Sequence, residues 1–326
     1  MSLAKRLPAG AEHFRRDSFS VPHGVGTTLI VPLRDPHLNE DVVCFAADLA
    51  TRLKGRVRLL HVRHPALSVA ADDMLLIDDG AQTVFRLRST DYLEAVIRRC
   101  SEAMDVHLSA KTCIGSDLAR IAKDELRTGS ELVVFRRQAR PEWQQIWLER
   151  ELRQLLHLPV PVLILPPAAQ SAVAWLGGGP GRVLVSIDDN LANSDAVRLA
   201  VELGGRDARY NLLRVLPMQL LNSVRRNRTD LSTGNSAAAN SRNQAWYTLR
   251  RARERIEQYG VTADVNVIFD NLAAGRAILS QAVSCRADFV VLTRQHSGRF
   301  PWAHRAWKHV ALNSHVPVLL CPDLRS

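Results

Sequence analysis

The chain has 326 residues, which is enough for two domains at roughly 150 residues each. Hydrophobic residues make up 46% and charged residues 23%, so global disorder is excluded, and no run of about 18 apolar residues predicts a membrane span. The formal net charge of +10 favours anionic partners, but the arginines are dispersed and we interpret them first as a solvated surface. Five cysteines without C-x-x-C spacing indicate no disulfide framework, so we expect a cytoplasmic protein.

Short apolar runs alternate with longer amphipathic stretches along the whole chain. After a flexible N-terminal arm over 1–26, the first half predicts strands at 28–33, 56–62, 106–112, 131–136 and 161–165, and helices at 39–53, 88–103, 115–127 and 143–157. The second half predicts strands at 182–187, 209–215, 264–269, 288–293 and 317–321, and helices at 193–206, 240–259, 272–285 and 302–313. Runs such as LVVF and FVVL lack period-two alternation, which is typical of strands covered on both faces. Together these patterns predict doubly wound α/β domains.

Two stretches break this alternation. The sequence PPAAQSAVAWLGGGPG is rich in Pro, Ala and Gly and predicts a linker over 168–181. It separates a first domain over 27–167 from a second over 182–326. The polar stretch 222–243 predicts a flexible loop before the long basic helix.

The two halves repeat each other. Four landmarks recur in the same order, and their offsets are 154, 154, 157 and 156 residues. The matched pairs are Asp35 with Asp189, Ala46 with Ala200, Glu131 with Asp288, and Val160 with Val316. A drift of only three residues is hard to obtain by chance, so the sequence predicts two copies of one domain.

Taken together, these segments resemble the universal stress protein family in its tandem form. The resemblance rests on VSIDDNLANSDAVRLAVEL, ADFVVLTRQHSG and HVPVLLCP in the second copy, and on SELVVFRRQ and LPVPVLILPP in the first. It implies a Rossmann-like fold of the adenine nucleotide alpha hydrolase type, with a five-stranded parallel sheet per domain. It also implies pairing of the two domains about a pseudo-twofold axis through their final strands, and a nucleotide site that some members have lost.

The family's nucleotide site combines an Asp after the first strand with a glycine-rich phosphate loop after the fourth. In the second half Asp188 stands at the Asp position, but only Gly298 remains of the loop glycines, and His304 and Arg305 replace the last Gly and Ser/Thr. Charged donors such as Arg294 and Arg305 could substitute for the lost amides. The candidate nucleotide-binding residues are therefore Asp188, Arg294, Gly298 and Arg305, although solvated residues around a decayed site are the interpretation we favour. Gly275 fits a helix start better than a ligand contact.

The first half departs further from the family's site. Arg34 replaces the Asp, and the loop after the fourth strand contains no glycine. Leu148 and Glu149 stand at the Gly and Ser/Thr positions, where a carboxylate would repel phosphate. We expect this half to hold no nucleotide in the family manner.

Motifs for other activities are missing. There is no H-E-x-x-H, G-x-S-x-G or Walker sequence, so we nominate no metal ligand and no catalytic residue. An Arg-rich helix from Trp246 could face nucleic acid, but Glu254 and Glu257 follow Arg250 and Arg253 by four residues, which is typical of a solvated face. No DNA or RNA recognition motif supports a nucleic-acid partner.

The leading hypothesis is a non-enzymatic stress-response or regulatory binding protein without a cofactor, unless ATP or AMP binds the second domain. The alternatives are an ATP-binding switch or slow ATPase acting through the second domain, and a basic nucleic-acid-associated factor. Beyond the intramolecular pairing of the two domains, a homodimer and regulatory protein partners stay open. No membrane partner is expected.

Overall fold

The computed structural model describes most of the regular elements of both halves. The described residues are 27–33, 40–63, 93–102, 104–114, 122–123, 126, 131–137, 154–155, 158–167, 179–187, 194–218, 234–270, 274–293 and 303–322. The predicted arm over 1–26, most of the predicted linker and most of the predicted helices 115–127 and 143–157 therefore lie outside the described part of the chain.

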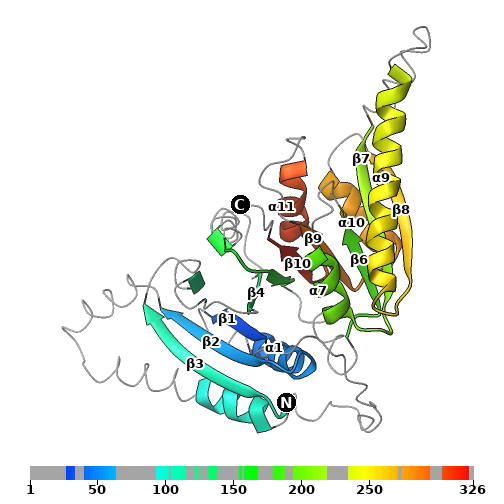
Figure 1. Cartoon of the computed structure of the whole chain (residues 1–326). Coiled ribbons are helices and arrows are strands. Elements are labelled where there is room, and N and C mark those ends of the chain that lie inside the picture. The colour runs from blue at the N-terminus through cyan, green and yellow to red at the C-terminus, as the bar shows by residue number, and fades with distance from the viewer. Residues whose placement is uncertain are drawn as a thin grey trace, which may run out of the picture.

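Ten strands form one continuous sheet. Their order is β3-β2-β1-β4-β5-β10-β9-β6-β7-β8, so each half contributes five adjacent strands (Figure 1). The strands of the first half are β1 (Thr28–Leu33), β2 (Arg56–Arg63), β3 (His107–Ile114), β4 (Glu131–Arg136) and β5 (Val162–Leu165). Those of the second half are β6 (Arg182–Ser186), β7 (Arg209–Pro217), β8 (Ala263–Asp270), β9 (Phe289–Thr293) and β10 (Val318–Cys321).

The register of the strands confirms the internal repeat. All pairings within each half are parallel, as predicted, and Leu29 lies opposite Leu132 just as Val183 lies opposite Phe289. The halves join through β5 and β10, which are antiparallel with Leu163 opposite Leu319. Those two leucines correspond through the repeat offset of 156, so the pseudo-twofold axis passes between them. Antiparallel pairing follows from this symmetry, because a twofold axis reverses the direction of the strand it generates.

Helices cover both faces of the sheet. Among the described residues, the longer helices are α1 (Glu40–Arg52), a helix over 93–102, α7 (Ser194–Gly204), α9 (Gly234–Glu257), α10 (Ala274–Ser284) and α11 (Ala303–Asn313). Side chains from α1, 93–102, α7 and α9 join one buried apolar cluster, and those from α10 and α11 join the other. Within β1, Leu29 and Val31 belong to the first cluster and Ile30 to the second, which is why this strand is apolar throughout.

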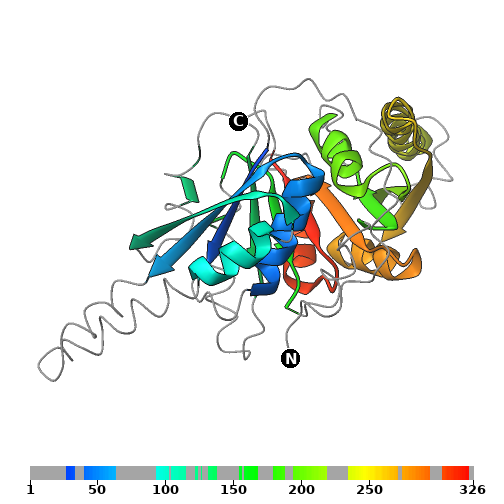
Figure 2. The same cartoon turned by 90° about the horizontal axis from the view of Figure 1, so that it is seen from below.

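Each apolar cluster draws side chains from both halves. Figure 2 shows the consequence, with the blue-to-green first half lying directly beside the green-to-red second half. The two copies therefore share their core across the β5–β10 pair instead of being connected only by the linker. None of the helices in the described part of the chain is long and apolar enough to cross a membrane.

The start of α9 differs from the prediction. The sequence predicts a flexible loop over 222–243 and a helix from 240, whereas α9 begins at Gly234 and projects past the carboxyl ends of β7 and β8 (Figure 1). The loop prediction is thus wrong from 234 onward, and 222–233 lie outside the described residues. The physical reason is the run of alanines at 237–239, which has the highest helix propensity of any residue type and outweighs the flanking Asn and Ser.

Arg137 of the first half binds the end of a helix in the second. Its Nη1 donates to the carbonyl of Ala311 at 2.9 Å and its Nη2 to that of Ser314 at 2.7 Å, at the C-terminus of α11. The side chain is 7% exposed, and burial lowers the pKa of its guanidinium, which nevertheless stays charged because arginine titrates far above neutrality. A cation at a helix C-terminus is favourable because it satisfies unpaired carbonyls and complements the dipole.

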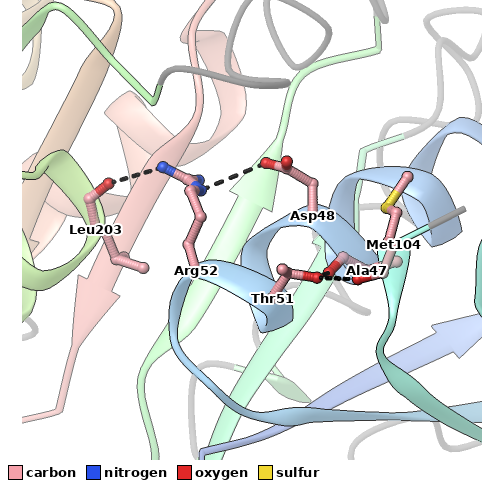
Figure 3. Close-up of polar contacts among 6 residues, drawn as sticks. All are labelled: Ala47, Asp48, Thr51, Arg52, Met104 and Leu203. Atoms are coloured by element: carbon pink, nitrogen blue, oxygen red, sulfur yellow. Dashed lines mark hydrogen bonds and ion pairs between the residues drawn. The ribbon is translucent and has the colours of Figure 1, made fainter. Parts of the chain in front are cut away.

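Arg52 makes a similar but weaker contact. It lies in the last turn of α1, where its Nε is 3.3 Å from Asp48 Oδ2 and its Nη1 donates to the Leu203 carbonyl of α7 at 3.5 Å (Figure 3). Burial lowers the pKa of the Arg52 guanidinium, and the nearby Asp48 carboxylate partly offsets this. Beside it, the Thr51 hydroxyl donates to the carbonyls of Ala47 and Met104. Two arginines of the first half thus bind the C-termini of two second-half helices.

Candidate functional site

The strand order places one switch point in each half. The order reverses between β1 and β4 in the first half and between β6 and β9 in the second. In open α/β sheets, ligands bind beyond the carboxyl ends of the strands at such points, because the flanking connections leave in opposite directions and open a crevice. These two places are the candidate sites.

In the first half, an ion pair crosses the switch point. Arg136, the last residue of β4, binds Asp41 Oδ1 in the first turn of α1 through its Nη1. Its Nη2 donates to the carbonyl of Pro167, just beyond β5, at 2.7 Å. The two side chains are only 18% and 22% exposed. The guanidinium thus connects α1 with the segment after β5 through its bonds to the Asp41 carboxylate and the Pro167 carbonyl.

Local sequence explains why this pair forms. Parallel strands end at the same edge of the sheet, and α1 begins at the edge where β1 ends, so the end of β4 faces the first turn of α1. An acidic residue is favoured in the first turn of a helix because it complements the positive end of the dipole. Asp41 therefore both stabilises the start of α1 and forms the ion pair with Arg136.

The second half carries different residues at the same positions. Through the repeat offset of 157, Thr293 replaces Arg136 at the end of the fourth strand of the half, and threonine carries no charge with which to pair. Instead, Arg214 of β7 is buried at 6% exposure and donates from Nη1 to the carbonyl of Ile187 at 3.1 Å. Ile187 directly follows β6, so a buried cation lies next to the switch point of this half.

The predicted site residues are only partly placed by the structure. Asp188, Arg294 and Gly298 lie outside the described residues, and Arg305 lies in the first turn of α11 with its side chain outside the described part. In the first half, Arg34, Leu148 and Glu149 also lie outside it. Their roles at a nucleotide site stay predictions.

The structure confirms the helix-start role of Gly275. It is the second residue of α10, and a Cβ at this position would lie 2.8 Å from His309 Cβ and 2.9 Å from the Ala306 carbonyl oxygen of α11. These distances are too short for a real side chain, so glycine is required for the close approach of α10 and α11.

The sequence alone does not single out Arg136 and Arg214 as residues that shape the two switch points. The signal for Arg214 is visible in hindsight, since a single charge interrupts the apolar strand NLLRVLP. For Arg136 the signal is its position directly after the buried run LVVF. The partners of both residues come from other elements, and no local pattern indicates them. Within the described ranges, no group of three His, Cys, Asp or Glu side chains could hold a metal ion.

The sequence matches no protein-family model and no curated protein. Solved structures do match over nearly the full length. A universal stress protein from Archaeoglobus fulgidus is 17% identical, with 90% of this chain and 96% of that chain covered and a TM-score of 0.58. A putative universal stress protein from Pseudomonas aeruginosa UCBPP-PA14 is 13% identical, with 92% and 94% covered and a TM-score of 0.55.

A functionally unknown protein from Pseudomonas aeruginosa PAO1 is also similar, at 14% identity, 92% and 93% coverage and a TM-score of 0.53. Identities this low establish the fold alone. With the ten-stranded sheet and the β5–β10 pairing, they show that the chain has the α/β fold of tandem universal stress proteins.

Proposed function

Because the chain has the tandem universal stress protein fold, we propose that it is a non-enzymatic stress-response protein that acts by binding. In this proposal the first half supports the second structurally and holds no nucleotide. The second half provides the one remaining ligand site, in which the glycine-rich phosphate loop of the family is degenerate.

The observation that carries this proposal is the ion pair between Arg136 and Asp41. A nucleotide seated at the first switch point would have to share the space beyond β1 and β4 with this pair and with the bond from Arg136 to the Pro167 carbonyl. Separating a partly buried charge-assisted pair costs free energy that the phosphate contacts would have to offset. The loop after β4 in this half contains no glycine, the residue type that lets backbone amides approach a phosphate most closely.

The second half supports a weaker or unorthodox site. Its sequence retains Asp188 and Gly298, and buried Arg214 adds a positive charge beside the end of β6. A single loop glycine leaves few backbone amides able to approach a triphosphate. We therefore expect ATP and AMP to bind with dissociation constants near or above about 1 mM, which corresponds to a binding free energy of roughly 4 kcal/mol.

Isothermal titration calorimetry of the whole chain with ATP and with AMP tests the proposal. The matched variants are Asp188→Ala in the second half and Asp35→Ala, which follows Arg34 after the first strand of the first half. Micromolar ATP affinity that D188A abolishes and D35A preserves would overturn the degenerate-site proposal. It would establish an ATP-binding switch instead, and steady ATP turnover by that site would make the chain a slow ATPase.

The outer face of α9 favours a second candidate function, binding of single-stranded nucleic acid. Trp246 and Tyr247 are 46% and 56% exposed, and Arg242, Arg250 and Arg251 are exposed beside them on the same helix. The Arg251 guanidinium lies 5.7 Å from the centre of the Tyr247 ring. Aromatic rings stack on bases and arginines neutralise phosphates, which is the combination that sequence-independent single-strand binding requires.

Fluorescence anisotropy with a labelled oligonucleotide at low salt tests this second candidate. We expect binding that weakens steeply with added salt and is reduced at least tenfold in W246A/Y247A. The control R276A/R286A removes two exposed arginines from the α10 side of the sheet and should weaken binding less. Absence of binding to RNA and DNA at low salt would eliminate the candidate, and the Arg253–Glu257 ion pair on this helix would then mark an ordinary solvated face.

A further inference from the structure

Two cysteines that are far apart in sequence meet under one face of the sheet. The Sγ atoms of Cys44, in α1, and Cys100, in the helix over 93–102, are 3.3 Å apart, although 56 residues separate them in the chain. All five cysteines of the chain are present as thiols. Formation of a disulfide of about 2.05 Å would need the two sulfurs to approach by little more than 1 Å, which small side-chain rotations can supply.

The surroundings of the pair give the two thiols different accessibility. Cys100 is 4% exposed and belongs to the apolar cluster that α1 and the helix over 93–102 share. Cys44 is half-buried and packs against that cluster from its edge. A small oxidant can therefore reach Cys44, whereas Cys100 is positioned to react only with its neighbour.

We propose that Cys44 and Cys100 form a reversible disulfide when the protein meets a peroxide. The Cys44 thiolate attacks one oxygen of hydrogen peroxide, the O–O bond breaks, and Cys44 becomes a sulfenic acid as hydroxide leaves and is protonated to water. The Cys100 sulfur then attacks the Cys44 sulfur, the S–O bond breaks, and a second water leaves. Two thiols and one peroxide give one disulfide and two waters. A dithiol reverses the reaction by exchange.

Proximity is the physical reason to expect the disulfide instead of further oxidation. A thiol held 3.3 Å from a sulfenic acid reacts intramolecularly, at an effective concentration far above that of free peroxide. The sulfenic acid is therefore consumed before a second peroxide can convert it to sulfinic acid.

The disulfide would fix α1 to its neighbouring helix. α1 carries Asp41, which binds Arg136, at one end, and Arg52, which contacts the second half through the Leu203 carbonyl, at the other. Thr51 already links α1 to the Met104 carbonyl by a hydrogen bond of 3.1 Å. Oxidation at Cys44 would therefore stiffen the element that connects the first switch point to the second half.

The test is peroxide treatment of the whole chain, followed by blocking of remaining thiols and tryptic peptide mapping. Trypsin releases Cys44 in peptide 35–52 and Cys100 in peptide 100–111, each with a single cysteine. We expect one equivalent of hydrogen peroxide to yield these two peptides joined, with a deficit of two hydrogens, and dithiothreitol to separate them. Sulfinic acid on Cys44 without the joined pair, or joined peptides from two different chains, would overturn the proposal.

Variants and melting temperature provide a second readout. C44A and C100A should each abolish the joined peptides, whereas C285S, at a half-buried cysteine just after the end of α10, should leave them unchanged. Oxidised wild-type protein should melt roughly 2 to 6 °C above the reduced protein, because the cross-link restricts the unfolded chain. A melting temperature that rises equally in C44A would refute the assignment. If a variant fails to fold, the peptide map of the wild-type protein decides alone.

Discussion

The two halves of this molecule share one topology but use it differently. In the first half, Arg136 pairs with Asp41 across the switch point, and Arg52 and Arg137 reach out to bind the ends of second-half helices. In the second half, Thr293 takes the position of Arg136, and the buried charge near the switch point comes from Arg214 on a different strand. The duplicated fold thus has one copy in which Arg136 and Asp41 form an ion pair across the switch point, and one copy in which Thr293 stands at the position of Arg136.

This difference indicates how a duplicated fold can divide its tasks. Because the two copies share a sheet and a core, we expect them to unfold together, so that stabilising contacts can be concentrated in one of them. The second copy is then released from that constraint at its switch point. Measuring the dissociation constants of ATP and AMP tests whether the second half binds ligand. The substitutions below test whether the first half provides the stability.

The largest expected effect comes from breaking the support that Arg137 gives to α11. Arg137→Ala removes two buried charge-assisted hydrogen bonds to the Ala311 and Ser314 carbonyls and leaves both acceptors without that donor. We expect the free energy of unfolding, measured with urea, to fall by about 3 kcal/mol. R276A, at an exposed arginine of α10, is the control and should change it by less than about 0.5 kcal/mol. A loss for R137A no larger than that control would contradict the supporting role of the first half.

A smaller effect is expected inside the second half, at Gly275. Gly275→Ala places a Cβ against His309 and the Ala306 carbonyl and forces α10 away from α11. The strain outweighs the better helix propensity of alanine, so stability should fall by about 1–2 kcal/mol in the same urea assay. S280A on the exposed side of α10 controls for propensity. If G275A altered ligand binding at unchanged stability, this glycine would be a ligand contact and not a packing position.

The comparison between the two switch points is tested most directly by giving the first one the residue that the second one carries. Arg136→Thr introduces the residue that the second half carries and removes the ion pair with Asp41. Because the pair is about one-fifth exposed, we expect a loss of only about 1 kcal/mol, measured by thermal or urea unfolding. A double-mutant cycle with Asp41→Asn should give a coupling energy of similar size. A coupling energy of zero would mean that the Arg136–Asp41 pair does not stabilise the first switch point.

The last expected effect, about as small as that of Arg136→Thr, is a pH dependence specific to the second half. Tyr210, at the position where the first half has Val57, is buried and donates to the Gly205 carbonyl at 2.6 Å, and burial raises the pKa of its phenol. The neutral phenol is favoured in the folded state, so this stabilisation is present below about pH 10 and is lost as the unfolded chain ionises above it.

We expect wild-type stability to fall by about 1 kcal/mol more than that of Tyr210→Phe between pH 9 and 11. Tyr247→Phe, at an exposed tyrosine of α9, should instead follow the wild type. Parallel curves for wild type and Y210F would show that the phenol of Tyr210 does not ionise differently in the folded protein.

Part of the candidate site could be predicted from the sequence. The repeat offsets of 154 to 157 identified the corresponding positions of the two halves. The absence of loop glycines in the first half predicts that this half holds no nucleotide, and this stays a prediction. The arginines that cross or flank the switch points could not be predicted. Arg136 and Arg137 are neighbours in sequence, yet one binds Asp41 in its own half and the other binds the end of α11 in the other half.

The sequence by itself determined the ten strands, the helices that the structure describes and their repetition, because burial on both faces and helical periodicity are properties of neighbouring residues. The predicted helices over 115–127 and 143–157 lie mostly outside the described residues and stay predictions. It did not determine the early start of α9, where alanine propensity outweighed a polar composition. Only the tertiary structure decided the partners of charged and sulfur-containing side chains. The order of the strands brings distant segments together, which is why Arg137 contacts Ala311 and Cys44 contacts Cys100. Local sequence patterns do not predict such contacts.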